Sequence, residues 1–505
     1  MKKFFVALLS CMFFGCMLFL FACNNNNNYL LPTVESEYSV TISSSIENAV
    51  EFDGEVEQVV SKESEFTPVK ATAKLGYEIV NYTVNGVIYD FETIDLDNIN
   101  QDTKIVVNVD YATYELPIIN IFAQDEITSK EDYVDMNFSL TNCYDELVDV
   151  TGGIRLRGNS TMGYPKKPYR IKFDSKQSLF GLEKAKSWVL LAEYLDPSSL
   201  HNYTAMTLGN EADGLSFTTT PNKVNVYLNN EFLGLYTLCE QVQENKGRMD
   251  IEFDITDEMT TIFDYNFFLS MDESCIADAG ATLDETYIYN EKYDKYFEIK
   301  YPEKDDFPTE TQFNTFVNQL KVYVDNVLGI ISEGDFERIC GTINVDSLMD
   351  YYLVDLIMQE HDHYSKSFNM YYTTTSSNPM ENYKLNFGPI WDYDWCLDTP
   401  FTGEPNETFT ADVQKIYYSN CFFDALKLAE FKPLLATRYS KFFKAKLTHL
   451  PAHLETLKLK MRESLDLNAK KWYSNYDYDI TSKNIEFLVE YLVERKLFLD
   501  EYFSI

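Results

Sequence analysis

The stretch GPIWDYDWCLD, residues 388–398, places two aspartates, Asp392 and Asp394, between two tryptophans. If the stretch is extended, alternation puts both carboxylates on one side of the backbone and the aromatic groups on the other. Carboxylates among large apolar side chains tend to be partly buried, and a buried carboxylate needs a counter-charge. The stretch therefore predicts a bound cation at Asp392 and Asp394.

The composition around this stretch indicates a globular protein. The chain has 505 residues, of which 45% are hydrophobic and 15% aromatic, and this length is enough for several domains with a sizeable core. The 80 acidic residues outnumber the 42 basic ones, which gives a formal net charge of -38. Such a surface repels nucleic acid and anionic membranes, so we expect no binding to DNA or RNA.

The N-terminus indicates export. Lys2 and Lys3 precede an apolar run that reaches Phe21, as in a secretory signal peptide. The run ends in LFAC, which resembles the lipobox of bacterial lipoproteins, and that resemblance implies lipidation at Cys23. The alternative is a simple N-terminal membrane helix, because the run is just long enough to span a bilayer. In both cases we expect the rest of the chain outside the cytoplasm, at the cell surface and anchored to the bacterial membrane.

The rest of the chain changes character once. The first part alternates apolar and polar residues and carries Asn85-Gly86 as a hairpin turn signal. After Leu116, strand-like stretches, a helix capped by Asp196 and a hairpin turning at Asn229-Asn230 precede a mainly helical half. We predict an α+β fold in four segments: a signal peptide (1–23), an Asn-rich tether (24–33), a small all-β domain (34–113) and a larger domain (114–505).

A basic cluster lies in RLRGNSTMGYPKKPYRIKF, where a turn between two strands is followed by Lys166, Lys167, Arg170 and Lys172. In so acidic a chain such a cluster favours an anion, and phosphate fits. Arg170 and Lys172 alternate along one strand, so both can point into one cleft. The alternative is that these cations are solvated at a strand edge.

The stretch IMQEHDHYSKSFNMYY has the spacing of a catalytic loop. Asp362 is followed five residues later by Ser367 and seven later by Asn369. A kinase catalytic loop has an aspartate that accepts the substrate hydroxyl proton and, five residues on, an asparagine that holds the metal. Ser367 stands at that asparagine position, with Asn369 as a substitute. His361 and His363 could instead share a zinc ion, although no third histidine or cysteine lies nearby.

Four ordered motifs resemble the CotH spore-coat kinase family of atypical secreted or surface protein kinases. They are RGNST…PKKPYRIKF, WVLLAEYLDPSSLHN, VNVYLNNEFLGLYTLCEQV and GPIWDYDW. The resemblance runs from about Leu116 to the C-terminus, roughly three quarters of the chain. It implies a two-lobed kinase-like fold, with a β-rich N-lobe and a helical C-lobe. It also implies ATP, Mg²⁺ or Mn²⁺, and phosphoryl transfer to Ser or Thr of an unidentified protein.

Carried onto the matching positions, the resemblance implies Asp362 as the catalytic aspartate and Lys172, or alternatively Lys167, as the lysine that grips the phosphates. Further residues would bind the nucleotide, the last of them near the adenine: Lys167, Arg157, Arg170 and Glu240. Others would hold the metal, the first as the principal ligand: Asp392, Asp394, Ser367 and Asn369. No helix glutamate is evident as the partner of Lys172, and Glu211 is only a candidate.

Two other classes of protein remain open. The lipid anchor, the tether and the all-β domain also suit a surface adhesin built on a kinase-like fold that no longer turns over. A carbohydrate-active protein would use paired carboxylates as acid and base, beside the 37 tyrosines of the chain. The basic cluster has no evident role in that third class, and a metal-dependent thermal shift with nucleotide would separate it from a kinase.

Overall fold

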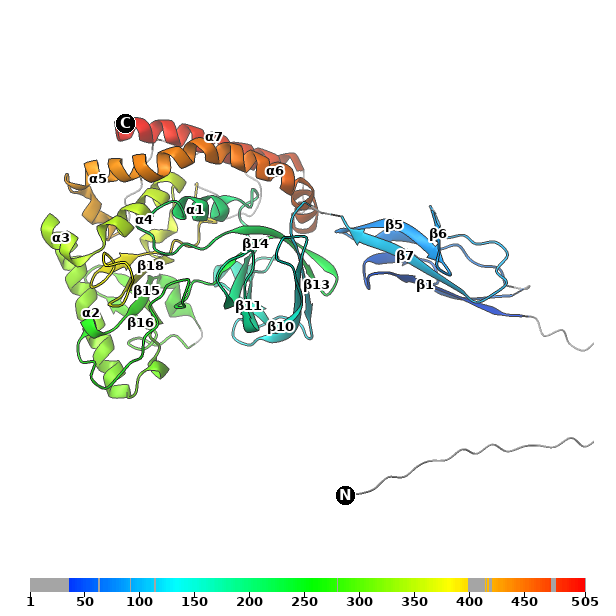
Figure 1. Ribbon diagram of the computed structural model, residues 1–505, viewed down its shortest axis with the longest axis horizontal. Helices are drawn as coiled ribbons and strands as arrows, with labels where there is room; N and C mark the ends of the chain where they lie inside the picture. Colours follow the sequence, from blue (N-terminus) through cyan, green and yellow to red (C-terminus); the bar gives the residue numbers. More distant parts are fainter. Residues whose placement is uncertain are drawn as a thin grey trace, which may run out of the picture.

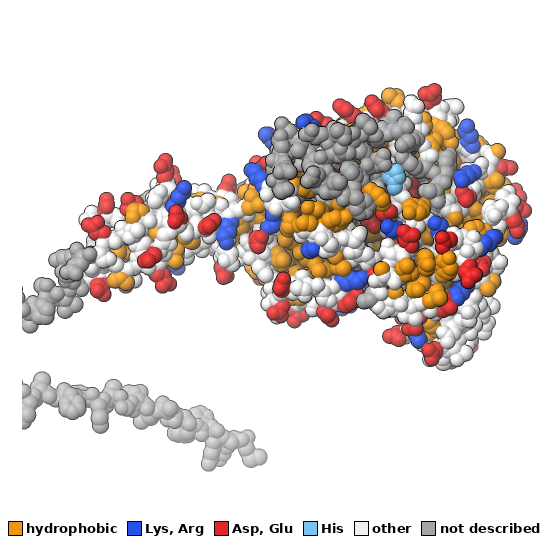
Figure 2. Space-filling model, turned by 180° about the vertical axis from the view of Figure 1, so that it is seen from behind, with side chains coloured by type: hydrophobic (Ala, Val, Ile, Leu, Met, Phe, Trp, Pro, Cys, Tyr) orange, Lys and Arg blue, Asp and Glu red, His pale blue; other side chains and the backbone are white. Residues whose placement is uncertain are grey.

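The computed structural model describes residues 36–504, except 62–63, 91, 113–114, 279, 398–413, 415, 417–419 and 474–477. The predicted signal peptide, the predicted tether and Cys23, the predicted lipidation site, all lie outside the described residues. Within the described part the chain is α+β, as predicted. No helix there is both long and apolar enough to cross a membrane. Acidic side chains are scattered over the face seen in Figure 2.

A five-stranded sheet in the order β3-β1-β7-β5-β6 forms the first unit. Its central strands β1 and β7 run parallel, from Val40 beside Thr103 to Ser44 beside Val107. The predicted turn at Asn85-Gly86 joins β5 and β6, with positive φ angles of 50° and 84° that suit a two-residue hairpin turn. The strands of this unit, with the small β2–β4 pair, are β1 (Tyr38–Ser44), β2 (Val50–Asp53), β3 (Glu57–Val60), β4 (Lys70–Ala73), β5 (Tyr77–Val84), β6 (Val87–Tyr89) and β7 (Thr103–Tyr111).

The second unit is a closed seven-stranded barrel in the order β10-β11-β12-β14-β13-β8-β9. Strand β11 buries Tyr169, Ile171 and Phe173 and leaves the alternate residues Arg170 and Lys172 outside. These two cations therefore share a face, as predicted. The barrel strands are β8 (Ile118–Ala123), β9 (Val134–Thr141), β10 (Leu147–Leu156), β11 (Tyr169–Gln177), β12 (Ala185–Leu191), β13 (Asn222–Leu228) and β14 (Glu231–Glu240).

The first sheet is docked on the barrel next to β13 (Figure 1). Tyr227 donates a hydrogen bond to the Gly76 carbonyl at 2.7 Å, and Tyr77 donates to the Asn230 carbonyl at 2.9 Å. Gly76 has a φ of 91°, and a Cβ there would lie 2.6 Å from Cβ of Phe232. The close approach of the two units therefore requires glycine at this position.

The third unit is a second five-stranded sheet, in the order β16-β17-β15-β18-β19, packed against helices (Figure 1). The mainly helical half predicted from the sequence thus contains a sheet of its own. Its strands are β15 (Phe267–Met271), β16 (Tyr287–Asn290), β17 (Lys295–Tyr301), β18 (Phe368–Tyr372) and β19 (Leu385–Phe387). Its helices, with α1 from the preceding segment, are α1 (His201–Gly209), α2 (Glu310–Glu333), α3 (Phe336–Thr342), α4 (Val345–Met358), α5 (Phe431–Arg438), α6 (Lys444–Trp472) and α7 (Tyr478–Tyr502).

Helix α1 begins later than the sequence predicted. The predicted N-cap Asp196 lies five residues before the helix, and its carboxylate accepts hydrogen bonds from the backbone N–H of Ser198, Leu200 and His201. These bonds fix a turn ahead of the helix, which runs from His201 to Gly209. Helices α2 and α4 lie in the half that the sequence predicted to be mainly helical.

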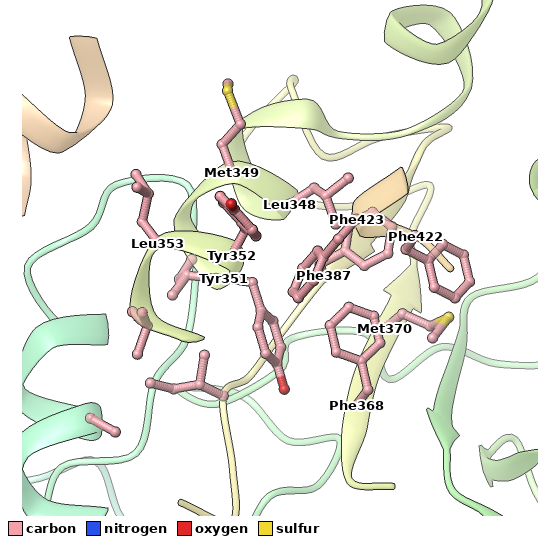
Figure 3. Close-up of a cluster of buried hydrophobic side chains, with 14 of the residues drawn as sticks. Leu348, Met349, Tyr351, Tyr352, Leu353, Phe368, Met370, Phe387, Phe422 and Phe423 are labelled. Carbon is pink, nitrogen blue, oxygen red and sulfur yellow. The ribbon is translucent and has the colours of Figure 1, made fainter. Parts of the chain in front are cut away.

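An aromatic core holds α4 against β18 (Figure 3). The ring centroid of Tyr351 on α4 lies 4.6 Å from that of Phe368 on β18, and Phe368 also stacks on Phe422 at 5.8 Å. The C-terminal part of α6 joins this helical part to the barrel, because Asn468 accepts a hydrogen bond from the Leu235 N–H at 3.1 Å. The contact between Tyr351 and Phe368 anchors the loop between α4 and β18 at both of its ends.

Candidate active site

A cavity of about 920 Å³ is lined by the barrel on one side and by the second sheet and its loops on the other. Its size is that of a site for a drug-sized or nucleotide-sized ligand. The segment that follows β14 also lines it, with residues 241–244. The barrel side carries more cations than carboxylates, with Glu131 and Glu193 among them, and the opposite side carries more carboxylates, with Lys300 and Lys366 among them.

Three residues predicted for catalysis and metal binding meet in this cavity. Asp362, Ser367 and Asp392 all line it, and the Ser367 hydroxyl donates to Oδ2 of Asp392 at 2.9 Å. The loop is held by Glu360, whose Oε1 accepts hydrogen bonds from the N–H of His361 and Asp362 at 2.8 and 2.7 Å. The residues singled out by the catalytic-loop spacing therefore lie together with Asp392 in one cavity.

The stretch 388–398 is not a strand in its described part, contrary to the prediction. Asp392 has a φ of 72°, and Ser367 beside it has a φ of 52°. A positive φ is uncommon outside glycine and breaks the strand-like alternation. Asp392, Asp394 and Trp391 all line the cavity nonetheless. Backbone strain of this kind concentrates at functional sites, where the surroundings hold it in place.

The carboxylates in the cavity are short of positive charge. Burial, with Asp392 and Glu360 nearby, raises the pKa of Asp394 well above its usual value. Burial is also the main cause that raises the pKa of Asp362 to about 6, and the charge of Asp392 adds to it while Lys366 opposes it. A cation next to these carboxylates would relieve the repulsion between them.

The donor set fits a magnesium ion that shares its coordination with phosphate. Among the described residues, no three His, Cys, Asp or Glu side chains converge as a complete metal site. Mg²⁺ at a nucleotide needs only one or two protein carboxylates, because phosphate oxygens and water fill the other positions. Asp392 and Asp394 would supply those carboxylates, and Ser367 would supply a hydroxyl. Asn369 lines the cavity as well, but its amide donates to the Pro389 carbonyl at 2.9 Å.

The zinc interpretation of the two histidines does not fit the structure. The ring of His363 is buried, with Nδ1 at 3.1 Å from Oδ1 of Asp355 and Nε2 at 2.8 Å from the Trp391 carbonyl. Both partners are acceptors, so both ring nitrogens carry a hydrogen. Neither nitrogen of His363 then has a lone pair for a metal.

Arg157 lines the cavity and feels the charges of Asp392 and Asp394. Its guanidinium lies over the Trp391 ring at 5.1 Å from the centroid. Burial lowers its pKa, and the negative charges of Asp392 and Asp394 oppose that effect. Arg170 also lines the cavity and donates to Oε1 of Gln243 at 3.3 Å. Both arginines therefore occupy the region predicted to bind the nucleotide.

Lys172, Lys167 and Glu240 do not line the cavity. Lys172 is exposed, with Nζ 5.9 Å from the centroid of the Tyr133 ring. Lys167 donates to the Met162 carbonyl, and Glu240 accepts from the Thr220 N–H. The prediction that Lys172 and Arg170 point into one cleft is wrong for Lys172, which lies farther along β11 on the shared face.

Lys166 is the lysine of the basic cluster that reaches the cavity. It is 1% exposed, and its Nζ lies 4.5 Å above the centroid of the Tyr236 ring. Burial and the nearby charge of Lys223 lower its pKa well below the usual value. It precedes β11, which begins at Tyr169, and its Nζ donates a hydrogen bond to the Leu235 carbonyl.

A buried ion pair beside the cavity was not predicted from the sequence. Nζ of Lys223 lies 2.7 Å from Oε2 of Glu193, and it also donates to the Ser199 carbonyl and the Thr237 hydroxyl. The predicted candidate Glu211 instead pairs with Lys446 at 2.6 Å, away from Lys172. Glu193 follows β12 and Lys223 lies in β13, and no sequence motif links these two segments.

A comparison with protein families identifies the family of the chain. A model described as CotH kinase protein matches residues 154–499. The chain belongs to the CotH family. The CotH match starts within β10 and reaches α7, so it covers the cavity and the helical part. No curated protein matches the chain.

Proposed function

We propose that this CotH-family protein is a metal-dependent protein kinase that transfers the γ-phosphoryl group of ATP to Ser or Thr of another protein. The observation that carries the proposal is the cavity itself. It places Asp362 and a Ser367-bound Asp392 on one side and Arg157 and Arg170 on the other. A kinase site combines carboxylates that hold the metal and accept the hydroxyl proton with cations that bind the phosphates.

Phosphoryl transfer leaves the protein little covalent work, so its residues act by positioning and by balancing charge. Arg157 and Arg170 would bind the phosphate oxygens, and Asp392 with Asp394 would hold the metal, which neutralises phosphate charge when it is bound. Asp362 would accept the proton of the acceptor hydroxyl. Its raised pKa, about 6, keeps it ionised at neutral pH while making it a better base than an exposed aspartate.

We extend the proposal to the arrangement of the domains and their location. The barrel would act as the N-lobe of a kinase-like fold and the second sheet with its helices as the C-lobe. The segment 241–244, which lines the cavity after β14, would join them near the adenine. A lipid on Cys23 would anchor the chain outside the cytoplasm, where its protein substrate lies.

The test is calorimetric titration of ATP into the full-length protein, with and without Mg²⁺, beside Asp392→Asn. We expect metal to tighten binding in the wild type. Asp392→Asn keeps the side-chain shape but should weaken metal-dependent binding by about 10- to 100-fold, the usual result of losing a charged ligand. A folded wild type that binds no ATP with either Mg²⁺ or Mn²⁺ would retire the kinase proposal in favour of a surface adhesin.

A pair of substitutions tests which cations face the phosphates. Arg157→Ala should weaken ATP binding by about 10-fold or more, because a charge-assisted contact is lost. Lys172→Ala should change the dissociation constant by less than about twofold, because Lys172 is exposed outside the cavity. Equal losses in both variants would contradict the placement of the site.

A further inference from the structure

Asp355 on α4 connects the catalytic loop to both neighbours of Asp392. It accepts a hydrogen bond from Nδ1 of His363 at 3.1 Å and another from the Tyr393 hydroxyl at 2.5 Å. His363 in turn donates through Nε2 to the Trp391 carbonyl at 2.8 Å. One buried carboxylate therefore reaches the residues on either side of Asp392.

These contacts are shielded from solvent and carry charge. Asp355 is 8% exposed, His363 is 2% exposed and Tyr393 is fully buried. Burial disfavours the charged imidazole, but Asp355 and Glu360 outweigh it and raise the pKa of His363 to about 10. A charged donor to a buried carbonyl makes a stronger hydrogen bond than a neutral one.

The backbone on the far side of Asp392 is fixed as well. The Tyr393 N–H donates to Oδ1 of Asn202 on α1 at 2.8 Å. Asp392 thus lies between a carbonyl held from α4 and an N–H held from α1, while its own φ is 72°. A strained conformation persists only where the surroundings determine it in several ways, and here they act on both flanking residues.

We propose that Asp355, His363 and Tyr393 form a positioning network that holds Asp392 in its left-handed conformation with the carboxylate in the cavity. The inference rests on the proposed function, because it assigns the network to the residue that would hold the metal. None of the three side chains lines the cavity. They would act through Asp392 and not on the nucleotide.

The test compares two identical substitutions of buried tyrosines. Tyr393→Phe removes the hydrogen bond to Asp355, and Tyr439→Phe removes one to Asp500 in the same helical part but away from the cavity. His363→Gln is the second variant of the network. In each full-length protein, Mn²⁺ binding in the presence of ATP is measured by the EPR signal of free Mn²⁺, and ATP binding without metal is measured by calorimetry.

We expect Tyr393→Phe and His363→Gln to weaken Mn²⁺ binding by about 10-fold, as losses behind a metal ligand do. Metal-free ATP binding should stay within about twofold, because the arginines are untouched, and Tyr439→Phe should match the wild type in both measurements. If folded Tyr393→Phe and His363→Gln bind Mn²⁺ as tightly as the wild type does, the positioning network is overturned and the proposed function still stands. A wild type without metal-dependent ATP binding would overturn the proposed function together with it.

Discussion

Asp362→Asn should lower kcat for phosphoryl transfer by about 10³-fold, the usual contribution of a positioned general base. The amide keeps the shape of the side chain and its place in the cavity but cannot accept the hydroxyl proton. Affinity for ATP should change little, since Asp362 is assigned to the acceptor. The measurement is transfer of radiolabelled phosphate from ATP to a generic acceptor protein, together with ATP titrations of both proteins.

The same residue sets the expected pH dependence. The pKa of Asp362 is raised to about 6, with burial as the largest cause. The ionised form is the base, so kcat should rise as the pH increases through about 6 and level off above it. Asp362→Asn should lack this step. A variant that retains the step, or that retains more than about a tenth of the wild-type rate, would remove Asp362 from the role of base.

The second large effect concerns stability. Lys223→Met should lower the free energy of unfolding by about 3–5 kcal/mol, because it leaves a buried charge without its partner. Lys223 and Glu193 are 4% and 5% exposed, and their charged atoms lie 2.7 Å apart. Methionine has a similar volume, so lost packing contributes little. Urea unfolding followed by circular dichroism gives the change.

The matched control is Lys172→Met, the same substitution at an exposed lysine, which should change stability by less than about 0.5 kcal/mol. The double variant Lys223→Met/Glu193→Gln should be more stable than Lys223→Met alone, because the uncompensated charge of Glu193 is gone. If Lys223→Met proves as stable as Lys172→Met, the buried ion pair does not hold the barrel strands to the turn before α1.

Local patterns predicted the local structure well. In the half predicted to be mainly helical, the apolar residues of α2 recur at helical spacing and form its buried face, whereas α4 is buried on nearly all sides. The turn at Asn229-Asn230 was predicted because asparagine tolerates a positive φ, and both residues adopt one, at 50° and 61°. Closure of the barrel had no local signal, because it depends on β8 pairing with β13 far along the chain.

The candidate site, like the fold, was predictable only where a local pattern marked its residues. Asp362, Ser367 and Asp392 were found because their spacing in two motifs matches a known arrangement. Lys172 was misplaced because alternation specifies the face of a strand but not which residue on that face reaches a cavity. The contact of His363 with Asp355 joins a loop to a helix, and such contacts leave no pattern in the sequence.

The parallel pairing of β1 with β7 has a mechanical consequence. β1 is the first strand of the described chain and β7 is the last strand before the barrel, and they lie side by side at the centre of the sheet. Tension applied ahead of Tyr38 and resisted beyond Tyr111 would pull these strands past each other along their length. Their hydrogen bonds would share that load and would not open one at a time. A protein held by its N-terminal side would thus meet a pulling force first with a strand pair loaded in shear.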